Sequence, residues 1–152
     1  MSFKDSFSQG LSAAAHAENQ TKEIDSVFVE LNEQIMEASG GKIEIYRRET
    51  YEEADLTGTI TALTSVTGML NRKKIVGIFA KNPNQKNPSL IGAVKIDKRG
   101  YPCEIKVGET RLICEDKSSL TKALNYLLAD VEVGKTLTKI MAYKEGKPDA
   151  SL

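Results

Sequence analysis

Tryptophan is absent from this sequence, and histidine and cysteine are scarce: its 152 residues include one histidine and two cysteines. His16, Cys103 and Cys114 are too few to supply the four ligands of a usual structural zinc site, and two cysteines cannot build a disulfide scaffold. A serine or cysteine nucleophile would have only His16 as its base, on a helix that we expect to be exposed. We therefore predict no metal, no cofactor and no catalytic residue, while a site assembled from distant loops stays an open alternative.

Long apolar runs are also missing. No stretch approaches the roughly 18 to 20 apolar residues needed to span a bilayer, and the N-terminal segment lacks the charged start and continuous apolar stretch of a signal peptide. Hydrophobic residues make up 40% and charged residues 28% of the chain, which is ordinary for soluble proteins. We predict a cytoplasmic protein that does not bind membranes and that folds as one domain.

The letters GKT within VEVGKTL, residues 131 to 137, suggest a nucleotide-phosphate loop. Such a loop needs an earlier glycine at the position that Ala129 occupies. It must also follow a strand, whereas the preceding NYLLADV is typical of a helix and offers no glycine that would let the backbone wrap a phosphate. We interpret Gly134 instead as the end of one helical piece, with Leu137, Ile140 and Met141 continuing in a second piece.

A long N-terminal helix is predicted from Leu11 to about Ala38, because this stretch has no glycine or proline and the pair Gly40-Gly41 follows it. Residues 1–10 form either a loose arm or the start of that helix. The apolar residues fall at helical spacing on one face: Ile24, Val27, Phe28, Leu31 and Ile35. The first half of the helix has little to bury, so we expect it to project or to pair with a second copy.

The predicted homodimer contacts are four residues of that stripe: Ile24, Phe28, Leu31 and Ile35. The alternative is that the stripe packs on the chain's own sheet, on the face that carries Ile91, Ala93 and Ile113.

Six segments are predicted to be strands from their alternation and their β-branched residues: 42–48, 59–66, 74–81, 90–96, 101–107 and 110–115. The last three form a meander whose turns set the register. The link DKRG, residues 97–100, would pair Val94 with Cys103 and Gly92 with Ile105. The two-residue turn Gly108-Glu109 would pair Cys103 with Cys114.

This register separates the meander into two faces. The apolar face carries Leu90, Val94, Ile96, Tyr101, Cys103, Ile105, Val107, Leu112 and Cys114. The other face carries Lys95, Glu104, Lys106 and Arg111, mixed with Ile91, Ala93, Pro102 and Ile113. We interpret the two cysteines as reduced core thiols, although opposed residues could also lie within disulfide reach.

A C-terminal helix capped by Ser118 or Ser119 would cover the apolar face. Its predicted buried stripe is Leu120, Leu124, Leu127 and Val131. The sequence thus predicts an α+β fold with a long N-terminal helix, an antiparallel meander of five or six strands, and a C-terminal helix on one sheet face. Residues 1–41 form the arm and long helix, and residues 42–152 form the core that folds with them as a single domain.

Charge is segregated along the chain although its total is zero: residues 1–56 carry a balance of −7 and residues 72–112 a balance of +7. The acidic run at 51–55 lacks the glycine and alternating ligands of a calcium loop, so we interpret it as a solvated connector. Lys95, Lys106 and Arg111 share the polar sheet face, where they could contact phosphates. Four further cations lie at a hairpin tip or beside a loop: Lys98, Arg99, Lys81 and Lys86.

Single-strand binding also needs aromatic platforms, and Phe79 is the one candidate in this basic region. The alternative is that the acidic and basic regions neutralise each other in the fold. Our leading hypothesis is a non-enzymatic protein-binding module, such as a small bacterial or phage-type inhibitor, immunity or adaptor protein, which could form a homodimer through the N-terminal helix. The rival is a nucleic-acid-binding accessory protein that uses the basic face of residues 72–112.

Overall fold

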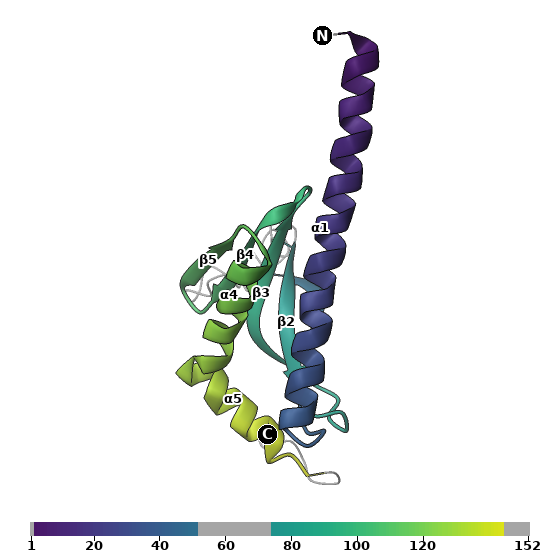
Figure 1. Cartoon of the computed structure of the whole chain (residues 1–152). Coiled ribbons are helices and arrows are strands. Elements are labelled where there is room, and N and C mark those ends of the chain that lie inside the picture. Colours follow the sequence, from purple (N-terminus) through teal and green to yellow (C-terminus); the bar gives the residue numbers. More distant parts are fainter. Residues whose placement is uncertain (1, 52–73, 145–152) are drawn as a thin grey trace, which may run out of the picture.

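The computed structural model describes residues 2–51 and 74–144. Within these ranges the chain forms α1 (Phe3–Ala38), β1 (Glu44–Tyr51), β2 (Lys74–Lys81), β3 (Ser89–Asp97), β4 (Gly100–Val107), β5 (Thr110–Cys114), α4 (Lys117–Ala129) and α5 (Val131–Met141). The strands make one antiparallel meander in the order β1-β2-β3-β4-β5 (Figure 1). The predicted α+β architecture is confirmed, while the strand predicted at 59–66 and the acidic run after Tyr51 lie outside the described residues.

The three helices contribute to one core on a single face of the sheet (Figure 1). α1 contacts β1 and β4, α4 contacts β4 and β5, and α5 contacts β2 and β3. The largest fully buried side chains come from both layers: Ile24, Ile78, Cys103, Ile105, Cys114, Leu120 and Leu127. The alternative that the α1 stripe packs on its own sheet is confirmed. The predicted face is wrong, because α1 packs on the face that carries the cysteines, whereas Ile113 is 60% exposed.

α1 begins at Phe3, eight residues before the predicted start at Leu11. Ser2 caps it: its side chain accepts a hydrogen bond from the Asp5 N–H, and the Asp5 carboxylate accepts one from the Ser2 N–H. This reciprocal capping box satisfies donors that would otherwise have no partner at a helix start. The helix ends before Gly40 and Gly41, whose φ values of 65° and 82° suit glycine.

The β3–β4 register differs from the predicted one by two residues. Val94 pairs with Ile105 and Ile96 with Cys103, because the ladder is irregular between this pair and the hairpin turn, where Asp97 pairs with Gly100. Pro102 lies in this irregular stretch and has no N–H to donate, so a regular ladder cannot run through it. A shift of two residues keeps the β4 side chains on their predicted faces, and the predicted β4–β5 register is confirmed.

A bulge in β3 overturns the predicted positions of Leu90 and Ile91. Ile78 pairs with Gly92 while its neighbour Phe79 pairs with Leu90, so Ile91 is the extra residue in the ladder. The bulge reverses the alternation at this point. Ile91 is therefore buried in the core, and Leu90, which was expected inside, is 50% exposed.

The C-terminal cover consists of two helices that meet at Asp130, not at Gly134. The Asp130 side chain accepts hydrogen bonds from the N–H groups of Glu132 and Val133 and so caps α5, which contains Gly134 in its interior. Because α5 is a separate helix, the positions that face the core differ from those of one continuous helix. Val133 is buried, whereas Val131, predicted to be buried, is exposed.

α4 begins two or three residues earlier than the predicted caps, with Asp116 at the N-cap. The Asp116 carboxylate accepts from the Ser119 N–H at 2.8 Å, and this backbone hydrogen bond lowers the pKa of Asp116. Three of the four predicted stripe residues, Leu120, Leu124 and Leu127, are buried as expected.

Candidate protein-binding surfaces

The N-terminal half of α1 extends beyond the sheet and the other helices (Figure 1). Among the described residues, the first hydrogen bond from α1 to the sheet is made by Gln20, whose Oε1 accepts from the Tyr101 N–H at 3.1 Å. Residues 3–19 lie before this point and, at 1.5 Å per residue, add about 25 Å of free helix. We call this segment the projecting half.

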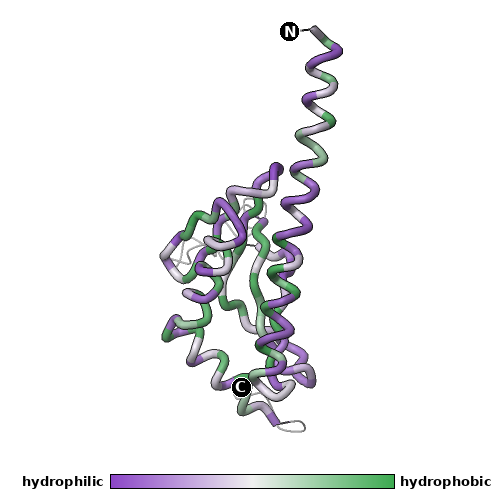
Figure 2. Tube along the Cα trace, in the orientation of Figure 1, coloured by the Kyte–Doolittle hydropathy of each residue, from purple (hydrophilic) through white to green (hydrophobic). Residues whose placement is uncertain are grey.

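Three large apolar side chains lie exposed along the projecting half. Phe3, Phe7 and Leu11 are 97%, 67% and 59% exposed, and their spacing of four residues places them on successive turns of one face. Figure 2 shows apolar residues recurring along this segment between polar ones. We call Phe3, Phe7 and Leu11 the exposed stripe.

The exposed stripe is separate from the face by which α1 joins the core. With 3.6 residues per turn, the exposed stripe is centred about 100° around the helix from Ile24, Val27, Phe28 and Leu31. The sequence reasoning missed this second stripe because residues 1–10 were not assigned to the helix. The signal was present in the S-x-x-D cap at Ser2 and in the four-residue spacing that follows it.

The residues predicted to form a homodimer contact are occupied within their own chain. Ile24, Phe28 and Leu31 are buried in the core, and Ile35 packs against it. The guanidinium of Arg47 lies 4.3 Å from the centre of the Phe28 ring and pairs with Asp25 at 2.9 Å. A homodimer through α1 would therefore have to use other residues of this helix.

The structure places Lys95, Lys106 and Arg111 on one face of the sheet, as predicted. Lys95 pairs across the ladder with Glu104, and Lys106 pairs with Arg111. The described helices lie on the opposite face. Glu104 lies among these cations, however, and its carboxylate is 3.5 Å from Arg111. The face is therefore basic but partly neutralised by its own carboxylate.

The other predicted cations do not join this cluster as a continuous surface. Lys81 shares this face but lies at the end of β2, two residues beyond Phe79, where it pairs with Glu44 at 4.0 Å. Lys86 lies in the exposed loop between β2 and β3. Lys98 and Arg99 form the β3–β4 turn, where Arg99 pairs with Asp97 at 3.0 Å. The Arg99 backbone N–H lowers the pKa of Asp97.

Phe79, the predicted aromatic platform, is not available for stacking on a base. It is only 6% exposed, its ring stacks on Tyr46 with the centroids 6.0 Å apart, and the Arg48 guanidinium lies 4.6 Å from its centre. Gly77 lies under this arrangement, where a Cβ would come within 2.7 Å of the Phe79 ring and of Leu90. The Phe79 ring therefore packs against neighbouring side chains on the surface of the sheet.

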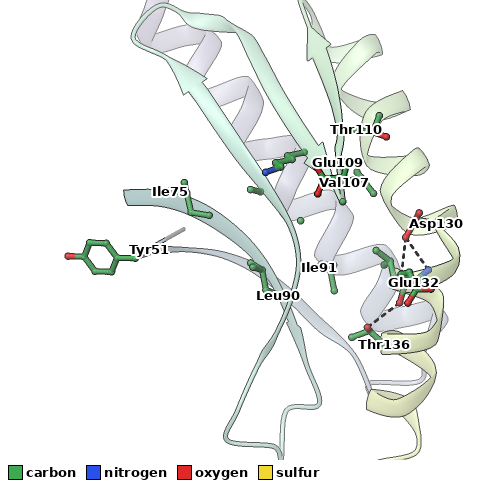
Figure 3. Close-up of a pocket in the computed structure, with 15 residues that line it drawn as sticks. Tyr51, Ile75, Leu90, Ile91, Val107, Glu109, Thr110, Asp130, Glu132 and Thr136 are labelled. Atoms are coloured by element: carbon green, nitrogen blue, oxygen red, sulfur yellow. Dashed lines mark hydrogen bonds between the residues drawn. The ribbon is translucent and has the colours of Figure 1, made fainter. Parts of the chain in front are cut away.

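A hollow of about 770 Å³ lies beside β3, the β4–β5 turn and the start of α5 (Figure 3). Its polar groups on α5 are engaged within that helix. Asp130 caps the first turn through the Glu132 and Val133 N–H groups, and the Thr136 hydroxyl donates to the Glu132 carbonyl at 3.1 Å. We assign no ligand to this hollow.

The two cysteines are free thiols buried side by side on β4 and β5, as expected for core residues. Burial raises the pKa of Cys103 to about 12 and also raises the pKa of Cys114. A thiol that resists ionisation is a poor nucleophile. Residues 2–51 and 74–144 contain no group of three or more histidine, cysteine, aspartate or glutamate side chains that could hold a metal ion.

No protein-family model, curated protein sequence or solved structure matches the chain. In the part of the chain that the structure describes, none of the helices has the length and apolar character needed to cross a membrane.

Proposed function

We propose that the protein is a non-enzymatic protein-binding module, of the kind found in inhibitors and adaptors, and that the projecting half of α1 is its main binding element. The observation that carries this proposal is the exposed stripe. Single exposed apolar residues are common on protein surfaces. A row of three on successive turns of a helix that projects from its own domain supports an interaction surface, because such grouped exposure is unusual.

The projecting half suits the helix-in-groove mode of recognition. An amphipathic helix binds a partner by placing apolar anchors at spacings such as i, i+4 and i+7 into a groove. Aromatic residues are the most effective anchors because each contributes a large area with few rotatable bonds. Two of the three anchors here, Phe3 and Phe7, are aromatic, and the Ser2–Asp5 cap holds their turn in helical form before any partner arrives.

The test is affinity capture with the full chain and two variants. The first variant carries Phe3→Ala, Phe7→Ala and Leu11→Ala, which remove the exposed stripe while keeping good helix-forming residues. The matched control carries Gln9→Ala and Ser12→Ala on the opposite side of the same turns. We expect the natural chain and the control to recover the same specific partner, and the stripe variant to lose it. Equal recovery by all three proteins would contradict the proposal.

Nucleic-acid binding is a second candidate, supported by the shared face of Lys95, Lys106 and Arg111. The Arg111–Glu104 pair and the buried Phe79 ring weaken it. Titration of labelled single- and double-stranded oligonucleotides at low and moderate salt tests it, because phosphate contacts weaken steeply with salt. Salt-sensitive binding that is lost in Lys95→Glu/Lys106→Glu/Arg111→Glu would favour this candidate.

The matched control for that experiment is the same charge reversal on the exposed positions of the C-terminal helices, Lys117→Glu, Lys122→Glu and Lys139→Glu. Both variants change the net charge by the same amount. Oligonucleotide binding that both variants lose equally would reflect net charge alone, and absence of binding at low salt would remove the candidate.

A further inference from the structure

We propose that the protein dimerises by antiparallel pairing of its projecting half with the projecting half of a second copy. This inference rests on the proposed protein-binding function and specifies the partner. It starts from the distribution of side-chain size within residues 3–19. The large residues Phe3 and Phe7 lie in the first half of the segment, and small residues fill the second half in the run Ala13 to Ala17, interrupted by His16.

Antiparallel pairing brings the first half of one helix against the second half of the other, so that Phe7 meets the alanine run and Phe3 lies opposite Asn19. With Leu11 near the two-fold axis, Phe7 of one copy lies against Ala14 and Ala15 of its partner. Gly10 has open space around its Cβ position, so this turn permits a close approach of the two helices. Alternation of large and small residues across facing positions is how helix interfaces reach dense packing, and parallel pairing would instead place Phe against Phe and Ala against Ala.

Charge and length agree with the same arrangement. The segment has few charges, and antiparallel pairing places Lys4 of one copy near Glu18 of the other. Because the first hydrogen bond between the sheet and α1 is at Gln20, the two helices can overlap along most of residues 3–19 before either domain meets its partner. The pairing is isologous, so the same surface of both copies is used and the assembly closes at two.

The proposed interface is small for a stable dimer. Burying three large side chains from each copy removes on the order of 1,000 Å² of surface from water. This is slightly below the range of about 1,200 to 2,000 Å² for stable specific interfaces. An interface at this end of the range forms reversibly, so the fraction of dimer depends on protein concentration.

Light scattering on the full chain across micromolar concentrations tests the dimer. We expect the mass to rise from the monomer value of 16.7 kDa toward twice that value as concentration increases. The Phe3→Ala/Phe7→Ala/Leu11→Ala variant stays monomeric, and the Gln9→Ala/Ser12→Ala control dimerises like the natural chain. A mass that stays at 16.7 kDa throughout overturns the dimer.

Cysteine cross-linking tests the orientation. Under mild oxidation Leu11→Cys, near the two-fold axis, forms a disulfide-linked dimer, whereas Phe3→Cys does not, because its two thiols lie about 24 Å apart along the axis. Equal cross-linking at both positions shows parallel pairing and overturns the proposal. A chain that stays monomeric but captures another protein through the exposed stripe would overturn the dimer and keep the protein-binding function. A chain that neither dimerises nor captures a protein through the exposed stripe would overturn both proposals.

Discussion

The two halves of α1 are continuous in backbone but differ in what surrounds them. From Gln20 to Ala38 the helix is fixed by its own chain: Ile24 lies fully buried, Tyr101 donates a hydrogen bond to Glu23, and Asn32 accepts one from β1. From Phe3 to Asn19 the same helix presents its apolar residues to solvent. The difference teaches that one helix can carry two apolar stripes on different faces, one that packs its own core and one that is exposed and that we propose binds a partner.

The largest expected contrast is between Ile24→Ala and Leu11→Ala. Ile24 has no exposed surface, so its truncation leaves a core cavity and lowers the free energy of unfolding by about 2 to 5 kcal/mol. In dilute monomer, Leu11→Ala changes it by less than about 0.5 kcal/mol. Urea unfolding of both variants measures this contrast. Equal losses of unfolding free energy in the two variants would show that the two halves of α1 are not distinct.

Asn32→Ala should remove a hydrogen bond between the core-packed part of α1, residues 20–38, and the edge strand β1. The Asn32 Oδ1 atom accepts from the Ile45 N–H at 2.8 Å. Its removal leaves that backbone donor without its partner and lowers the free energy of unfolding by about 1 to 3 kcal/mol. Gln34→Ala, which removes only an exposed contact to Glu30, is the control and should unfold like the natural chain in urea.

Tyr101→Phe removes the hydroxyl that binds Glu23 at 2.9 Å, and should lower the free energy of unfolding by about 1 kcal/mol near neutral pH. Burial and this hydrogen bond raise the pKa of Tyr101 above its ordinary value of 10.0. The folded state therefore keeps the proton more tightly than the unfolded state, so the stabilisation is complete below pH 10 and is lost as pH rises above it.

Urea unfolding of natural and Tyr101→Phe proteins between neutral and alkaline pH measures this effect. The difference in stability between the two proteins should shrink as pH rises above 10. A difference that stays constant across this range would show that the Tyr101 hydroxyl does not titrate differently in the folded state.

Gly10→Ala has the smallest expected effect on the domain. The Cβ would meet no atom within 4 Å, and alanine favours a helix over glycine by roughly 1 kcal/mol. In dilute protein, amide exchange in the projecting half should slow severalfold while the urea midpoint of the core stays unchanged. A shift of that midpoint would mean that the two halves unfold as one unit.

The sequence was informative wherever a local pattern decides the structure. The spacing of four and then three residues between Ile24, Phe28 and Leu31 predicted the packed face of α1, and the turn Gly108-Glu109 predicted the pairing of Cys103 with Cys114. The bulge at Ile91 was not predictable, because an extra residue in a ladder depends on the neighbouring strand. The break at Asp130 was missed because Gly134 is the stronger local signal, although an aspartate cap determined the outcome.

The candidate site was predicted only in part. Projection of the first half of α1 followed from how little the run AAAHAENQTK has to bury, and the shared face of Lys95, Lys106 and Arg111 followed from alternation. The exposed stripe was missed, since Phe3 and Phe7 were not assigned to the helix. Partial neutralisation by Glu104 and the burial of Phe79 depend on side-chain packing across strands, which alternation does not specify.

Hydrogen exchange of the full chain at two protein concentrations tests the central claim that one half of α1 is held by its own chain and the other by a second copy. The prediction is that amides of residues 24–38 are protected to the same degree at both concentrations. Amides of residues 7–19 should gain protection as concentration rises through the micromolar range. Protection of residues 7–19 that is independent of concentration would contradict the account.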